Sequence, residues 1–231
     1  MRGNRITVIK LGGSFVGSRH LAGWVDVLAN SAGSSVVVPG GGPFADAVRH
    51  AQAKLSFSDA VAHHLALLAM EQFGQVLANL SSRFFIVYSA ATIRRVLRAG
   101  DVPIWSPTRM VLRRPEITPS WDITSDSLAV WLAGHIGAEQ IVLVKHGGPF
   151  ENPVRAVDLV ERGIVDRAFP RFLAASGARA SIVAAKNYAS AARTIRNRGT
   201  PGTSVDLHRP GAKRLLPQSW PTSKSHAGDG R

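Results

Sequence analysis

Short apolar runs rich in β-branched residues alternate along this chain with longer segments of helical periodicity. Strands are predicted at residues 5–11, 34–39, 84–89, 141–145, 180–185 and 203–207. Helices are predicted at residues 19–32, 43–54, 58–80, 90–99, 125–137 and 187–197. Strands that alternate with helices favour an open, largely parallel sheet covered on both faces. The predicted fold is therefore of the α/β class, a three-layer α/β/α sandwich that binds ligands at the carboxyl ends of its strands.

Length and charge predict one globular domain followed by a basic tail. The chain has 231 residues, of which 45% are hydrophobic, and we expect residues 1–208 to form a single domain. Residues 209–231 carry five basic residues against one acidic residue and are rich in Pro, Gly and Ser, a composition that predicts disorder. The net charge of +13 indicates anionic partners. Nucleic acid bound by the tail is an alternative, but a solvated tail and small phosphorylated ligands are favoured.

The composition also bears on the compartment. No apolar run reaches the roughly 18 residues that a membrane helix needs, and the first residues lack the apolar stretch of a signal peptide. The chain has no cysteine, so disulfides and thiolate metal sites are excluded. We therefore expect a cytoplasmic protein with no membrane partner.

The first strand carries a lysine immediately before a glycine turn, in the sequence VIKLGGS at residues 8–14. Lys10 could simply carry its ammonium out to solvent, and Gly12 and Gly13 could serve a tight turn. Alternatively, bare glycine backbone lets N–H groups approach a phosphate while the ammonium supplies charge. On this second interpretation Lys10, Gly12 and Gly13 form a phosphate cradle.

A second glycine turn follows the next strand, in the sequence VVVPGGGPFADAVR at residues 36–49. Three consecutive glycines, Gly40, Gly41 and Gly42, are costly to order, so the fold must need bare backbone there. Their position between a strand and a helix favours a second phosphate site over a simple tight turn. Arg49 lies on the following helix and is either a phosphate ligand or a solvated surface residue.

A third candidate lies in PSWDITSDSLAVWLAGHIGA, residues 119–138. Asp122, Thr124 or Ser125 is expected to cap a helix, which places Asp126 in its first turn. Acidic residues there complement the helix dipole without any catalysis. Alternatively, Asp126 points toward the phosphate site and fixes lysines or Mg²⁺.

The order of these motifs, completed by IVLVKHGG at residues 141–148, resembles the amino acid kinase superfamily. The resemblance spans roughly residues 5–207. Two further stretches, AHHLALLAMEQFG and LVERGIVDRAFPRFL, are most similar to the branch that phosphorylates aminomethylfuranylmethyl phosphate in methanofuran biosynthesis.

The resemblance implies roles for the motif residues. By analogy with the family, Lys10 bridges the transferred phosphoryl group, Gly12, Gly13 and Ser14 line the nucleotide phosphates, and Asp126 organises the catalytic lysines. The resemblance also implies that Gly40, Gly41 and Gly42 hold the acceptor side, that His63 lies in the substrate pocket, and that ATP and Mg²⁺ are cofactors. Relatives commonly form homo-oligomers.

Some features depart from the family pattern or leave alternatives open. Many relatives carry acids where this chain has KHGG, a departure in the loop that helps to hold ATP in the family. Lys145 is either a second phosphate ligand or an exposed strand-end lysine, and Lys186 is a weak candidate for a second catalytic lysine. Apart from the resemblance, a packed histidine is the default interpretation of His63. His63 does not form a metal site with His64, because adjacent helix residues point to different faces, and no other metal ligand set is predicted.

The expected function is an ATP-dependent kinase that transfers a γ-phosphoryl group to a phosphate monoester, best matched by the aminomethylfuranyl compound. Its amine would pair with Asp46, Asp59 or Glu71, among which the sequence does not choose. The alternatives are an isopentenyl phosphate or UMP kinase, and a nucleotide-binding protein that has lost the reaction.

Overall fold

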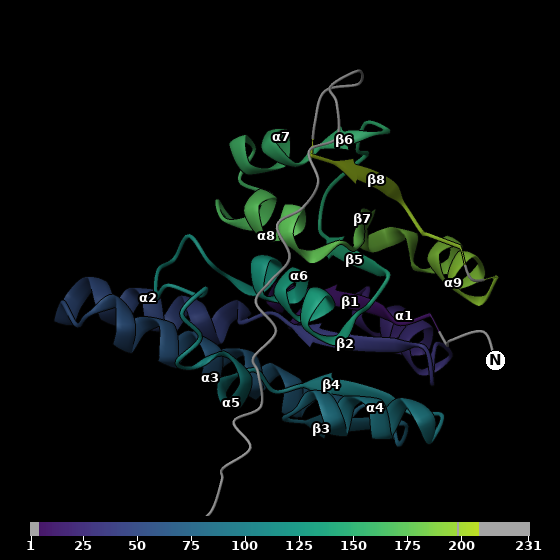
Figure 1. Ribbon diagram of the computed structural model, residues 1–231, viewed down its shortest axis with the longest axis horizontal. Helices are drawn as coiled ribbons and strands as arrows, with labels where there is room; N and C mark the ends of the chain where they lie inside the picture. Colours follow the sequence, from purple (N-terminus) through teal and green to yellow (C-terminus); the bar gives the residue numbers. More distant parts are fainter. Residues whose placement is uncertain (1–4, 198, 208–231) are drawn as a thin grey trace, which may run out of the picture.

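The computed structural model describes residues 5–197 and 199–207, and within them the strands form one mostly parallel sheet (Figure 1). Its eight strands run in the order β3-β4-β2-β1-β5-β7-β8-β6, with the β7–β8 pair antiparallel. Their bounds are β1 Thr7–Leu11, β2 Ser35–Pro39, β3 Phe84–Val87, β4 Val102–Trp105, β5 Gln140–Lys145, β6 Val154–Arg155, β7 Arg179–Ala184 and β8 Thr203–Asp206. The predicted α/β sandwich is confirmed, while the tail at 209–231 lies outside the described residues.

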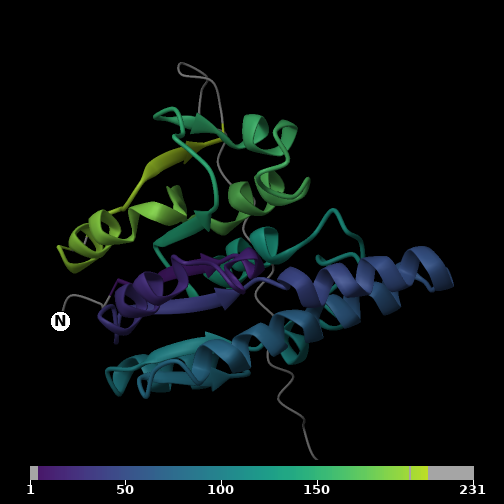
Figure 2. The same ribbon diagram turned by 180° about the vertical axis from the view of Figure 1, so that it is seen from behind.

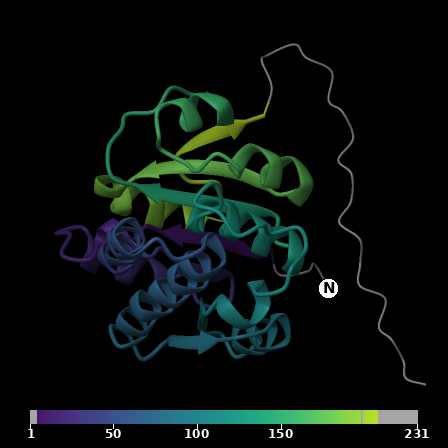
Figure 3. The same cartoon turned by 90° about the vertical axis from the view of Figure 1, so that its left-hand side faces the viewer.

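Helices cover both faces of this sheet. Apolar side chains of α4, α6, α7 and α8 share one core with one face, and those of α1 and α9 share a second core with the other. Figure 2 shows the molecule from the side on which α1 lies. Helix α3 contributes to both cores. Helices α2 and α3 project beyond the sheet (Figure 1), and Figure 3 shows the molecule from the end to which they project. The helix bounds are α1 Leu21–Ala29, α2 Gly42–Leu55, α3 Asp59–Ala78, α4 Ala90–Arg98, α5 Thr108–Val111, α6 Ser125–Ile136, α7 Ala156–Glu161, α8 Phe169–Ser176 and α9 Tyr188–Arg196.

The predicted strands and helices agree with the structure, with ends that differ by a few residues. Strand β4 was missed because Pro103 interrupts its short apolar run, and proline cannot donate a ladder hydrogen bond. The short elements β6, α5, α7 and α8 were also missed. None of the described helices is long and apolar enough to span a membrane.

The parallel register places the ends of three strands at one edge. Lys10 of β1 lies opposite Val38 of β2 and Leu143 of β5, so the turns after these strands emerge together. The three strands are almost completely buried, as their valine and isoleucine content predicts. This edge therefore carries both glycine turns and the KHGG segment.

Candidate active site

The two glycine turns pack directly on one another. A Cβ atom at Gly13 would lie 1.9 Å from the backbone nitrogen of Gly42, and one at Gly40 would lie 2.4 Å from the nitrogen of Gly13. The Gly40 N–H donates to the Leu11 carbonyl at 2.8 Å, which ties the second turn to the end of β1. The glycines thus serve a close backbone approach between two turns, a reason that either motif alone did not reveal.

Beneath these turns, one buried carboxylate lies between two lysines. The Lys10 Nζ lies 2.9 Å from Asp126 Oδ1, and the Lys145 Nζ donates to Asp126 Oδ2 at 2.7 Å. Lys10 and Asp126 are about 95% buried, and the Lys145 side chain is 16% exposed. Lys10 is therefore not a solvated lysine, nor is Lys145 an exposed strand-end residue. We call this arrangement the Lys10–Asp126–Lys145 cluster.

Burial and charge oppose one another in this cluster. Burial, reinforced by Lys145, lowers the pKa of Lys10 to about 8, although Asp126 acts in the opposite direction. Burial alone would raise the pKa of Asp126, but the two ammonium groups outweigh it and the net pKa is lowered. At neutral pH the cluster holds two cations and one anion, an excess of positive charge facing the turns.

A cavity of about 280 Å³ opens above this cluster. The predicted site residues that line it are Lys10, Gly12, Gly13, Ser14, Gly41, Gly42, Arg49, His63 and Lys145. Gly40 is packed against Gly13, and Asp126 lies behind its two lysines. The walls also include apolar residues from α3 and α6 and from the loop before α6: Ala66, Leu67, Met70, Ile123 and Leu128. Lys186 does not line this cavity; it is exposed in the short turn before α9.

Arg49 and Trp121 form one end of the cavity, and the sequence did not single out Trp121. The Arg49 guanidinium carbon lies 4.2 Å from the centre of the Trp121 ring, and its Nη1 lies 3.0 Å from Asp46 Oδ1. The Trp121 Nε1 donates to Gln52 Oε1 at 2.7 Å, which fixes the ring against α2. His63 is buried on the facing helix α3, and burial lowers its pKa, so the imidazole is neutral at pH 7.

The three carboxylates expected as amine partners lie in different places. Asp46 lines the cavity. Asp59 accepts a hydrogen bond from Gln52 at the start of α3, and Glu71 accepts one from the Thr108 N–H at 3.0 Å. Asp59 and Glu71 are thus engaged in structural contacts away from the described cavity lining, which leaves Asp46 as the carboxylate in reach of a ligand there.

The KHGG segment folds back onto the first glycine turn. The His146 ring lies 4.7 Å from the Phe15 ring and 6.3 Å from the His20 ring, measured between centroids. His20 in turn lies 6.4 Å from Tyr188 at the start of α9. The aromatic ring of His146 thus follows Lys145 directly and lies against the first glycine turn.

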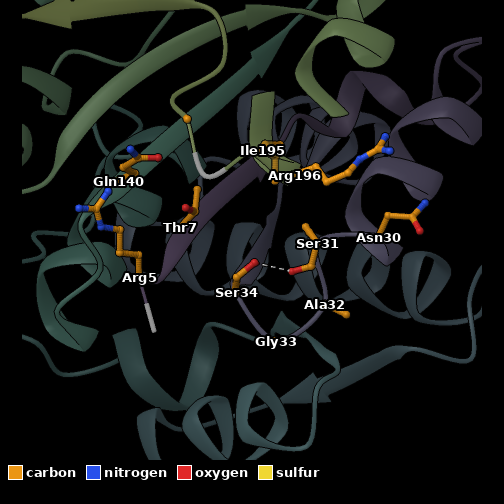
Figure 4. Close-up of a pocket in the computed structure, with 11 residues that line it drawn as sticks. Arg5, Thr7, Asn30, Ser31, Ala32, Gly33, Ser34, Gln140, Ile195 and Arg196 are labelled. Atoms are coloured by element: carbon orange, nitrogen blue, oxygen red, sulfur yellow. Dashed lines mark hydrogen bonds between the residues drawn. The ribbon is translucent and has the colours of Figure 1, made fainter. Parts of the chain in front are cut away.

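A second cavity of about 270 Å³ lies at the opposite edge of the sheet, where β1 and β5 begin (Figure 4). Its described lining includes Arg5, Thr7, Gln140 and Arg196 but none of the predicted site residues. There the Ser34 hydroxyl donates to the Ser31 carbonyl at 2.8 Å. Because ligands of parallel sheets bind at the carboxyl ends of strands, the first cavity is the candidate active site.

A sheet whose carboxyl edge carries two glycine turns over a buried lysine cluster is the framework of a phosphate-handling α/β enzyme. Residues 5–147, more than half of the chain, match the model of the amino acid kinase family. The chain belongs to the amino acid kinase family and is a phosphotransferase, as its motifs predicted.

Individual relatives agree with this assignment. The chain is 28% identical to [5-(aminomethyl)furan-3-yl]methyl phosphate kinase of Methanocaldococcus jannaschii, across 60% of this chain and 68% of that protein. The uridylate kinase structure from Archaeoglobus fulgidus matches with a TM-score of 0.65 and 16% identity, covering 87% of this chain and all of that one. UMP kinase from Ureaplasma parvum matches with a TM-score of 0.65 and 15% identity, covering 89% and 99% of the two chains. At such low identity these two structures establish the fold alone.

Proposed function

We propose that this protein is an ATP-dependent kinase that transfers a γ-phosphoryl group to a phosphate monoester and so makes a diphosphate. The observation that carries the proposal is the Lys10–Asp126–Lys145 cluster below the two glycine turns, at one end of a small cavity. We further propose that the acceptor is (aminomethylfuranyl)methyl phosphate, used in methanofuran-type cofactor biosynthesis. The name of the Methanocaldococcus jannaschii relative supports this choice.

The proposed reaction needs charge neutralisation more than it needs a base. An oxygen of the acceptor phosphate attacks the γ-phosphorus of ATP, the new P–O bond forms, and the bond to the β-phosphate oxygen breaks to release ADP. The second pKa of a phosphate monoester is about 6, so the attacking oxygen is already ionised at pH 7. Lys10 and Lys145 would neutralise the charge that accumulates as two polyanions approach, while Asp126 holds both lysines in place.

The residues that line the cavity fit a nucleoside triphosphate better than they fit a metal ion coordinated by protein side chains. Lys10, Lys145 and the backbone of Gly12 and Gly13 present positive charge and open amide groups to the cavity. Both Asp126 oxygens are already paired with lysines, and the described residues contain no cluster of three His, Asp or Glu side chains that could hold a metal ion. We therefore assign Mg²⁺ no protein ligand; bound to ATP, it would supply further neutralisation of the phosphates.

The far end of the cavity suits a flat acceptor with an amine. We propose that Asp46 pairs with the substrate ammonium and that Arg49, held against Trp121, contacts the acceptor phosphate. An aromatic ring would lie against the apolar wall formed by Leu67, Met70 and Ile123. An isoprenoid acceptor would gain nothing from Asp46, whose side chain is 69% exposed at the cavity mouth.

The reaction is tested by phosphorus NMR with Mg·ATP and, separately, the aminomethylfuranyl phosphate, isopentenyl phosphate and UMP. We expect diphosphate resonances with the furan compound, their loss in Lys10→Ala, and their retention in Lys186→Ala, whose lysine lies outside the cavity lining. If only UMP or only isopentenyl phosphate is turned over, that compound is the acceptor and the proposed furan acceptor is wrong. ATP binding without turnover of any acceptor would establish the non-catalytic alternative.

The role of Asp46 is tested by comparing Asp46→Asn with Asp59→Asn, since Asp59 binds Gln52 instead. We expect Asp46→Asn to raise the acceptor KM roughly tenfold, the size of a lost charge-assisted contact of ~1.4 kcal/mol. The KM for ATP should not change. An equal effect of both variants would contradict the assignment.

We also propose that the protein is a homo-oligomer in which a second copy covers the outer side of α3. Val61, Leu68, Val76 and Leu80 are 37% to 46% exposed along this side, and Phe85 of β3 is 45% exposed. Apolar side chains gathered on one face indicate an interaction site. Light scattering should report a mass above that of one chain, reduced in Leu68→Glu but not in Val157→Glu, which changes a similarly exposed apolar residue on α7. A monomeric wild type would contradict this proposal.

A further inference from the structure

The side chain of Asp166 caps the N-terminus of α6, although Asp166 lies far from this helix along the chain. It lies between α7 and α8, 42 residues beyond Thr124, the N-cap residue of α6. Asp166 Oδ2 accepts hydrogen bonds from the Thr124 N–H at 2.8 Å, the Thr124 hydroxyl at 2.8 Å and the Ser127 N–H at 3.0 Å. Its Oδ1 accepts from the Ser127 hydroxyl. Thr124 does not cap the helix with its own side chain, so Asp166 takes that part.

The same contact holds the loop that precedes α6. The Ala168 N–H donates to the Asp122 carbonyl at 3.0 Å, immediately beside the Asp166 hydrogen bonds. Trp121, Ile123 and Thr124 of this loop line the cavity. Asp126 lies between Thr124 and Ser127, the two residues that Asp166 binds. The contacts around Asp166 thus hold both the loop that lines the cavity and the helix turn that carries Asp126.

Asp166 is also electrostatically connected to the cluster. Burial and the neighbouring charge of Asp126 raise the pKa of Asp166, while the hydrogen bonds from Ser127 and Thr124 act in the opposite direction. The negative charge of Asp166 favours the charged form of Lys10, as Asp126 does, whereas Lys145 opposes it. Asp126, Lys145 and Asp166 are thus the charged groups with the largest effects on Lys10 among the described residues. A simple structural cap would be expected to stabilise α6 without any effect on Lys10.

We infer that Asp166 is a positioning residue of the active site, which holds the first turn of α6 so that Asp126 bridges Lys10 and Lys145. This inference rests on the proposed function for its kinetic consequences. The carboxylate neither lines the cavity nor contacts either lysine among the described interactions. It acts through Asp126 and through the field at Lys10.

The decisive variant is Asp166→Asn, which keeps the shape and one acceptor oxygen but removes the charge. Its matched control is Asp122→Asn. This variant removes an exposed carboxylate of the loop before α6, whose Oδ1 lies 3.6 Å from Arg167 Nη1. The Lys10 titration is followed by NMR of ¹³C-labelled lysine side chains, and the signal is assigned with Lys10→Arg. The chain has six lysines, so the spectrum is readily resolved.

In Asp166→Asn we expect the Lys10 midpoint to fall by about half a pH unit, because the variant removes a negative charge that favours the ammonium form of Lys10. We expect kcat to fall roughly tenfold or more while the KM values change less than about threefold, since the loss affects transition-state stabilisation. Asp122→Asn should change neither the Lys10 midpoint nor kcat. A lower melting temperature with an unchanged Lys10 midpoint and kcat would show a helix cap alone and overturn the inference.

A second variant covers the case in which Asp166→Asn does not fold. Asp166→Glu keeps the charge but displaces the carboxylate by one methylene, so the Lys10 midpoint should stay near that of wild type while kcat falls. An unchanged kcat in this variant would contradict the positioning role. If wild type turns over no acceptor, the proposed function fails, but the Lys10 titration still decides whether Asp166 acts on the cluster.

Discussion

The backbone nitrogen of Gly42 lies where a side chain at Gly13 would begin, since a Cβ atom there would approach it to 1.9 Å. A Cβ atom at Gly42 would likewise lie 2.3 Å from the Gly13 carbonyl oxygen, and Gly42 also has a φ of +51°. The loops after β1 and β2 can therefore approach so closely only because both carry glycine. Gly13 and Gly42 both line the cavity, so this contact contributes to its wall.

Gly13→Ala should destabilise the fold far more than Gly12→Ala. The backbone of Gly42 would have to shift, and we expect a loss of about 2 kcal/mol or more in the free energy of unfolding. At Gly12 the nearest atoms to a Cβ would be Ser14 Oγ at 3.3 Å and Lys10 Nζ at 3.6 Å, so we expect a loss below about 1 kcal/mol. Urea unfolding measures both, and equal losses would show that the two turns separate easily.

Substitution of either lysine of the cluster should lower kcat far more than substitution of Lys186. Lys10→Met and Lys145→Met each remove a cation from the cavity, and we expect kcat to fall about 10²- to 10³-fold, as for other electrostatic contacts made in the transition state. Lys186→Met removes an exposed lysine and should stay within about twofold of wild type. Initial rates of ADP formation measure these effects. A loss in Lys186→Met as deep as that in Lys145→Met would make Lys186 the second catalytic lysine.

The pH dependence should show opposite trends in activity and stability above pH 8. The pKa of Lys10 is lowered from 10.5 to about 8 in the folded protein, so kcat should decline as pH rises through 8 and the ammonium loses its charge. Between pH 8 and 10.5 the unfolded chain binds more protons at Lys10 than the folded chain does. The contribution of Lys10 to the free energy of unfolding therefore increases over that interval.

This pH prediction is checked with kcat between pH 6.5 and 10 and with the difference in unfolding free energy between wild type and Lys10→Met over the same range. A rate that stays constant to pH 10 would mean that Lys10 keeps its charge. A stability difference that does not vary with pH would contradict the lowered pKa directly.

Asp126→Asn should be strongly destabilising at neutral pH. It leaves the two ammonium groups without their shared buried carboxylate, and the loss of one partner of a buried ion pair typically costs about 3–5 kcal/mol. Since the pKa of Asp126 is lowered in the folded protein, its stabilisation is present above its unfolded pKa and is lost as pH falls through the folded pKa. Unfolding measured at several acidic pH values should show wild type and Asp126→Asn converging, and a gap that stays constant would contradict this account.

Much of the fold followed from local pattern. The alternation of apolar strands and amphipathic helices predicted the parallel sheet, because side-chain periodicity reports which face of each element is buried. It also predicted that Lys10 and both glycine turns lie at the same edge, because carboxyl ends of parallel strands meet there. Strand β4 was missed because its apolar run is short and contains Pro103.

The sequence by itself thus determined the layered architecture and the residue types available at the carboxyl edge, since both depend on neighbours within a few positions. Only the tertiary structure decided that Lys145 shares a carboxylate with Lys10, that Asp46 rather than Asp59 or Glu71 lines the cavity, and that Asp166 closes α6. These contacts join residues from separate strands and helices, whose spacing along the chain carries no information about distance. Register, helix packing and the contact between two glycine turns bring them together, and they exist only once the sheet has formed.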